Sequence, residues 1–154
     1  MSGHYTFYFR HCSVGTSDLD FSVDLSWWTS NNSKILSDML VEKDYKKLRT
    51  FGKPDSFGYE ESWVKDTVKV DIFSSVVRAG VHSIGQWVEG ELYSCSYPLA
   101  GVQEVTVPVW EGRRVRLPSP VEPVLVAMYG PNWRHPVTEW RWDVDPFLTG
   151  YCRY

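Results

Sequence analysis

The segment from Asp18 to Leu25 constrains the fold most, because polar and apolar side chains alternate along it without interruption. The apolar positions are Leu19, Phe21 and Val23, and the polar positions are Asp18, Asp20, Ser22 and Asp24. A period of two is typical of a strand with one buried face and one polar face. Asp is depleted in strands, so two Asp residues at alternate positions of one face call for a chemical explanation.

Similar patterns predict the other elements of the chain. We expect strands over residues 5–10, 46–51, 57–64, 68–73, 105–110 and 113–117, and helices over residues 33–44 and 120–129. The first helix would be capped by Asn31, Asn32 or Ser33, and the second would stop at Gly130. Residues 74–100 are rich in Gly, Ser and Tyr and give no clear prediction. This order predicts an α+β fold with one mixed or antiparallel sheet, and 154 residues predict a single domain over 1–154.

Composition excludes several classes of protein. With 43% hydrophobic and 23% charged residues, the chain has the balance of a globular protein. A net charge of -3 provides no positive field for nucleic acid, so no nucleic-acid partner is expected. The longest apolar run, residues 124–129, is too short to span a membrane. The three Cys residues are too widely spaced for a metal-binding pattern, and their spacing leaves open whether two of them form a disulfide.

Three carboxylates are the candidate metal ligands and catalytic groups. Asp18 and Asp20 would lie on one face of their strand, roughly 6–7 Å apart. Asp71 lies on the predicted strand 68–73 and would join them if the two strands pair. Carboxylates grouped in this way suit Mg²⁺ or Mn²⁺, which supports phosphoryl transfer. The alternative is that these acids simply face solvent on an exposed sheet.

Small and hydroxyl-bearing residues come directly before the acidic strand. Gly15 lets the backbone approach a ligand closely, and the hydroxyls of Thr16 and Ser17 can hydrogen-bond a phosphate. The alternative interpretation of this triplet is an ordinary turn.

These residues resemble the fukutin and LicD family of nucleotidyltransferase-fold proteins. The resemblance rests on RHCSVGTSDLDF at residues 10–21, VKVDIF at 68–73, and AMYGPNWRHP at 127–136, followed by WRWD at 140–143. It implies a nucleotidyltransferase-like mixed or antiparallel sheet flanked by helices. It also implies transfer of a phospho-alcohol, such as ribitol phosphate or phosphocholine, from a CDP-linked donor to a glycan or glycoprotein acceptor.

The same resemblance implies roles for individual residues. Asp18 and Asp20 would hold Mg²⁺ or Mn²⁺ against the donor's diphosphate. Asp71 would either complete the metal site or accept a proton from the attacking hydroxyl. Arg134 would reach a donor phosphate, or else brace the chain against Asp143 or Asp145. Fukutin-type relatives reside in the Golgi lumen, which gives the expected location.

A non-catalytic glycan-binding or scaffold protein is the alternative function. Members of the family carry a helix upstream of the first acidic strand, and this chain begins too late to include it, so truncation and loss of activity are expected possibilities. The 8 Trp, 9 Tyr and 7 Phe residues would then supply rings for stacking on sugars, although packing in the core and on half-buried strands is the favoured explanation for them.

Overall fold

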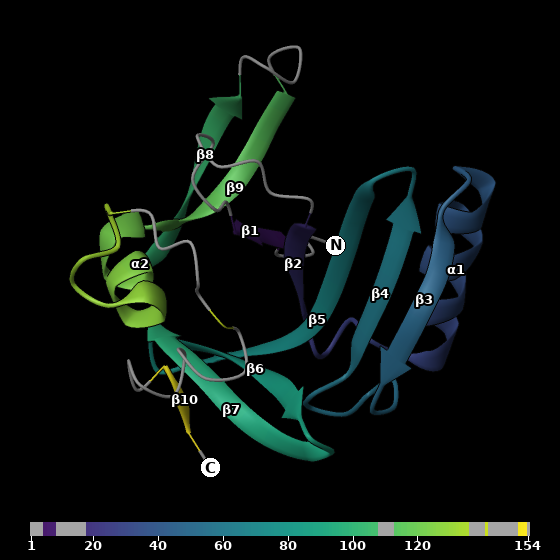
Figure 1. The fold of residues 1–154 in the computed structure, drawn as a ribbon, viewed down its shortest axis with the longest axis horizontal. Helices are drawn as coiled ribbons and strands as arrows, with labels where there is room; N and C mark the ends of the chain where they lie inside the picture. Colours follow the sequence, from purple (N-terminus) through teal and green to yellow (C-terminus); the bar gives the residue numbers. More distant parts are fainter. Residues whose placement is uncertain (1–4, 9–17, 108–112, 136–140, 142–150, 154) are drawn as a thin grey trace. The chain divides into compact units, whose positions relative to one another are not determined.

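The computed structural model describes residues 5–8, 18–107, 113–135, 141 and 151–153. These residues form ten strands and two helices (Figure 1). The chain divides into two compact units, Met1–Val76 and Val77–Tyr154, which are described separately below. A single domain over residues 1–154 stays a prediction.

The first unit is built on one sheet. Its strands lie in the order β1 (Tyr5–Tyr8), β2 (Asp18–Asp24), β5 (Val68–Arg78), β4 (Glu60–Lys65) and β3 (Lys46–Phe51). β2 and β5 run parallel, and every other neighbouring pair in this order is antiparallel. A parallel pair needs a long crossover connection, and helix α1 with strands β3 and β4 makes up that connection here.

Helix α1 (Ser30–Glu42) begins earlier than the predicted residue 33. The cap is Thr29, whose hydroxyl oxygen accepts a hydrogen bond from the backbone N–H of Asn32 at 3.2 Å. Ser33 therefore lies inside the helix and is buried against the sheet instead of serving as a cap. The half-buried Leu36 and Leu40 pack against the same core.

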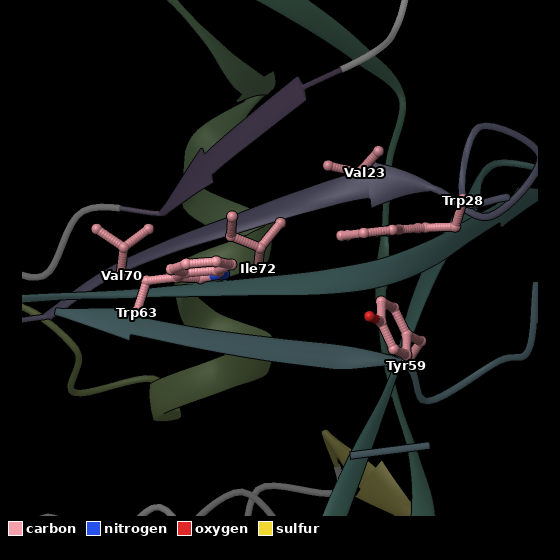
Figure 2. Close-up of a cluster of buried hydrophobic side chains, with 6 residues drawn as sticks. All are labelled: Val23, Trp28, Tyr59, Trp63, Val70 and Ile72. Atoms are coloured by element: carbon pink, nitrogen blue, oxygen red, sulfur yellow. The ribbon is translucent and has the colours of Figure 1, made fainter. Parts of the chain in front are cut away.

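The core of the first unit covers one face of β2, β5 and β4. Figure 2 shows its buried side chains, which are Val23, Trp28, Tyr59, Trp63, Val70 and Ile72. Leu19 and Phe21 pack against this cluster, so the apolar face predicted from the alternation in β2 is confirmed. Because side chains alternate along a strand, the residues between them form a polar face on the other side of the sheet.

The second unit consists of short antiparallel pairings. β6 (Val81–Val88) pairs with β7 (Glu91–Pro98), and β8 (Gly101–Val107) pairs with β9 (Arg113–Ser119). The turn between β6 and β7 contains two residues, Glu89 and Gly90, with φ of 53° and 87°. Two positive φ values in a two-residue loop match the right-handed twist of the flanking strands. This hairpin lies in the region that gave no clear prediction from sequence.

A helix and a disulfide complete the second unit. Helix α2 (Val121–Tyr129) ends at Gly130, as predicted, with a φ of 79°. It begins after Pro120 without a side-chain cap, because Ser119 belongs to β9 and does not cap the helix. The short strand β10 (Cys152–Arg153) pairs with β7, and Cys152 is disulfide-bonded to Cys95. Neither helix in the described part of the chain is long and apolar enough to cross a membrane.

The predicted fold class is wrong. The described residues are mostly strands, with one helix in each unit, and they do not form a nucleotidyltransferase-like sheet flanked by helices. The physical reason lies in residues 74–98, which continue β5 and form β6 and β7. Their Ser, Gly and Tyr residues have weak or mixed preferences, so pairing between strands decides their conformation.

Candidate functional site

The parallel register of β2 and β5 brings two of the predicted acids together. Asp20 lies directly opposite Asp71, and Asp18 lies opposite Lys69. Neighbouring strands are about 4.8 Å apart, and paired residues project from the same face, so Asp20 and Asp71 are side by side. From the sequence, we expected Asp71 to join the other acids only if their two strands pair, and in the structure these strands do pair.

Asp71 is the most deeply buried of these acids. Only 5% of the residue is exposed, and its Oδ2 lies 2.6 Å from the ammonium nitrogen of Lys69. Its Oδ1 is also buried and accepts no hydrogen bond from any described residue. Unsatisfied carboxylate oxygens are costly to bury, so this oxygen is where a further cation or proton donor fits best.

Strands β4 and β3 extend the polar face with groups that the sequence did not indicate. Ser62 lies opposite Asp71, and Glu60 lies two residues away on the same face of β4. Glu60 is 5% exposed, and its Oε1 lies 3.3 Å from the hydroxyl of Ser62 and 3.8 Å from a guanidinium nitrogen of Arg49. Burial, reinforced by the nearby charge of Asp71, raises the pKa of Glu60 above its ordinary value.

The resulting cluster contains more acids than cations. By their register, the acids Asp18, Asp20, Asp71 and Glu60 lie on this face together with three cationic residues, which are Lys46, Lys69 and Arg49. Hard oxygen donors in excess of positive charge fit Mg²⁺ or Mn²⁺. Among the side chains that the structure describes, no three His, Cys, Asp or Glu residues already form a metal-holding group, and the Asp18 side chain is not one of those described.

A β-bulge in β3 supplies cations to both faces of the sheet. The register shifts between Lys47 and Arg49, so that Lys47 lies opposite Trp63 and Arg49 lies opposite Ser62. Without the extra residue, positions 47 and 49 would share one face. With it, Arg49 reaches Glu60 on the polar face, while Lys47 reaches Glu61 on the helix-covered face at 3.1 Å.

Glu61 belongs to a structural network under helix α1. It is fully buried and accepts hydrogen bonds from Tyr59, from Ser33 at 2.9 Å and from the ring N–H of Trp63 at 2.9 Å. Burial, together with the hydrogen bond to Glu61, raises the pKa of Tyr59 to about 12. The hydroxyl of Tyr59 therefore stays protonated at physiological pH and remains a donor to Glu61.

The remaining predicted site residues lie elsewhere. Gly15, Thr16 and Ser17 fall outside the described residues. Arg134 belongs to the second unit, where it donates a hydrogen bond to Glu122 at 2.8 Å and lies over the ring of Trp133 at 4.3 Å. Its partner is therefore Glu122, whereas the sequence suggested Asp143 or Asp145, which lie outside the described residues.

One signal in the sequence could have extended the predicted site. Lys69 precedes Asp71 by two residues in an alternating strand, which places both on one face, and this follows from the sequence alone. Glu60 and Arg49 could not have been found in this way. Their meeting depends on the bulge in β3 and on the pairing of β4 with β5.

The aromatic residues described in the structure serve mainly as core. Trp28 and Trp63 are at most 1% exposed, so neither can stack on a glycan. A hollow of about 340 Å³ in the second unit is bordered by Tyr97. The ring of Tyr97 stacks with the rings of His82 and Tyr151, with centroid distances of 4.7 and 6.4 Å, so Tyr97 is already engaged in ring contacts within the protein.

Comparisons with known proteins add no information about function, so the argument about function rests on the geometry of the site. No protein-family model, no curated protein and no solved structure matches the chain.

Proposed function

We propose that this chain is a metal-dependent phosphotransferase. It would transfer a phospho-alcohol unit, of the ribitol phosphate or phosphocholine type, from a CDP-linked donor to a glycan. The resemblance to fukutin and LicD proteins contributes to this proposal only through the acidic residues, because the fold predicted along with it is wrong.

One observation carries the proposal, which is the in-register pairing of Asp20 with Asp71. Like charges directly opposite each other on neighbouring strands destabilise a sheet. Asp71 is also buried, and one of its carboxylate oxygens has no hydrogen-bond donor among the described residues. A divalent cation shared by the two carboxylates removes both costs at once.

The three Asp residues of the cluster have roles that follow from their positions. Asp20 and Asp71 hold the cation, and Asp18 extends the acidic edge by two residues along β2. A bound Mg²⁺ or Mn²⁺ polarises phosphoryl oxygens and neutralises the charge that develops on the leaving nucleotide. Asp71 either completes the metal site or accepts the proton of the attacking hydroxyl.

The first test is calorimetric titration of CDP into the folded protein with Mn²⁺ present, repeated with EDTA. We expect binding that depends on the metal and that is lost in Asp20→Asn. The matched control is Asp38→Asn, which removes an exposed carboxylate from helix α1 and should bind as the unmodified protein does. A folded protein that binds no CDP in the presence of Mn²⁺ would overturn the proposal.

The variant Asp71→Asn separates the two roles of Asp71. If Asp71 is a metal ligand, Asp71→Asn loses Mn²⁺-dependent CDP binding. If Asp71 is the proton acceptor, the variant binds Mn²⁺ and CDP but no longer turns over CDP-ribitol or CDP-choline. Circular dichroism spectra establish that each variant has folded before its binding is compared.

A further inference from the structure

A cationic side chain of the protein, that of Lys69, already contacts Asp71. The Lys69 ammonium lies 2.6 Å from Asp71 Oδ2, and its side chain is 27% exposed, whereas that of Asp71 is 8% exposed. Lys69 is therefore partly accessible to solvent, whereas the carboxylate with which it pairs is buried. It shares one face of β5 with Asp71 and lies opposite Asp18 in the register with β2.

A metal and Lys69 compete for the same carboxylate. Two cations a few ångströms apart repel each other, and more strongly at a partly buried site than in bulk water. A divalent ion at Asp71 therefore drives the ammonium away from Oδ2. A lysine side chain has four flexible carbons and three rotatable donors, so it can turn to a new anionic partner without any movement of the backbone.

A phosphate group is the partner that fits the displaced ammonium. Lysine binds phosphate as a compact point charge, and the partly exposed Lys69 shares a face with the carboxylates that would hold the metal. We propose that Lys69 is a displaceable counterion, which pairs with Asp71 without metal and moves to a phosphate oxygen of the nucleotide when metal and nucleotide bind together. This inference rests on the proposed function and assigns to the same site a residue that positions the donor.

Displacement of this kind couples the two ligands. Metal alone must break the Lys69–Asp71 ion pair, so its binding is weakened. Metal with a diphosphate gives the ammonium a new partner, so each ligand strengthens the binding of the other. The protein then favours the metal–nucleotide complex over free metal.

The test compares Mn²⁺ binding by the unmodified protein and by Lys69→Met, using the electron paramagnetic resonance signal of free Mn²⁺. Without CDP, we expect Lys69→Met to bind Mn²⁺ on the order of tenfold more tightly, because an adjacent positive charge has been removed. Adding CDP or inorganic pyrophosphate should strengthen Mn²⁺ binding less in Lys69→Met than in the unmodified protein. Lys34→Met, which removes an exposed lysine of helix α1, should match the unmodified protein in both conditions.

The outcomes distinguish this inference from the proposed function. Equal Mn²⁺ affinities for the unmodified protein and Lys69→Met, with both proteins binding CDP, would overturn the inference and leave the phosphotransferase proposal standing. No Mn²⁺ binding by either protein, with or without CDP, would overturn both proposals.

A measurement on the unmodified protein covers the case in which Lys69→Met does not fold. Acetic anhydride labels free lysine amines, and mass spectrometry reports the labelling of each one. Mn²⁺ alone should increase the labelling of Lys69, and CDP added afterwards should reduce it again, while labelling of Lys34 stays constant. If Mn²⁺ binds and the labelling of Lys69 does not change, Lys69 is not the displaced cation.

Discussion

At the scale of single residues, the polar face of the first unit contains buried carboxylates that lie close to cationic side chains. Asp71 and Glu60 are each 5% exposed, and they lie on neighbouring strands with one cation close to each, Lys69 and Arg49. Burial of two carboxylates in one cluster favours keeping one of them protonated. The raised pKa of Glu60 means that this carboxyl retains its proton more readily than an ordinary Glu side chain does.

The raised pKa of Glu60 makes stability depend on pH. A carboxyl whose pKa is higher in the folded state contributes stability that is fully present below its unfolded pKa, near 4.5, and is lost as pH rises through the folded pKa. Glu60→Gln resembles the protonated form and avoids that loss. We therefore expect Glu60→Gln to melt at the same temperature as the unmodified protein near pH 4 and at a higher temperature at pH 8.

Thermal melting at a series of pH values checks this expectation. A gain of about 1 kcal/mol would raise Tm by roughly 2–4 °C in a chain of this size, which is readily measured. The control is Glu42→Gln, which changes an exposed carboxyl at the end of helix α1 and should give no pH-dependent difference. A Glu60→Gln variant less stable than the unmodified protein at pH 8 would contradict the argument.

At the scale of elements, helix α1 is fixed to the sheet by a polar contact as well as by apolar packing. Ser33 is the buried residue of this helix, and its hydroxyl donates to Glu61 and lies 3.0 Å from the hydroxyl of Tyr59. When a buried acceptor loses a donor, the free-energy cost of removing that acceptor from water is no longer offset by a hydrogen bond. The contact therefore sets where the helix lies on β4.

Ser33→Ala should destabilise the protein by about 1–3 kcal/mol, because it removes one donor from the buried Glu61 carboxylate. Ser37→Ala makes the same change one turn later in the helix, at a hydroxyl that accepts a hydrogen bond from the Lys47 ammonium and does not contact Glu61 through any described bond, and it should change stability by about 0.5 kcal/mol or less. Urea unfolding followed by Trp fluorescence measures both. Equal losses in the two variants would show that helix propensity, and not the buried contact, is responsible.

The sequence predicted elements where periodicity was strong and failed where long-range pairing decided the structure. The alternation in β2 predicted its apolar face, and residues 46–51 form β3 as expected. The buried Glu61 could not be predicted, because its partner Ser33 lies 28 positions away and was interpreted as a helix cap. The bulge between Lys47 and Arg49 leaves no mark in the hydrophobic pattern, so the position of Arg49 in the site was missed.

At the scale of the whole molecule, the fold class was predicted wrongly because residues 74–100 carry little periodic signal. β6 and β7 pair across a two-residue turn, and its residues, Glu89 and Gly90, are a weaker indicator of a hairpin than Asn-Gly or Asp-Gly. The three Cys residues left a disulfide undecided, and the structure pairs Cys95 with Cys152 across 57 positions. Which two cysteines meet depends on the pairing of β10 with β7, which the sequence does not display.

The disulfide is the strongest constraint on the end of the chain, because β10 contains only two residues and cannot hold its position through backbone pairing alone. Both cysteines are buried, at 0% and 2% exposure. A bond that closes a loop of this length typically stabilises the folded state by about 2–4 kcal/mol, mainly by restricting the unfolded chain.

Reduction with dithiothreitol should therefore lower the guanidinium unfolding midpoint, with a thiol assay confirming that both sulfurs are free. The double variant Cys95→Ser/Cys152→Ser should unfold at the lower midpoint with or without the reductant. If full reduction leaves the midpoint of the unmodified protein unchanged, pairing and packing of β10 must hold the C-terminal strand, and the covalent bond would contribute nothing measurable to stability.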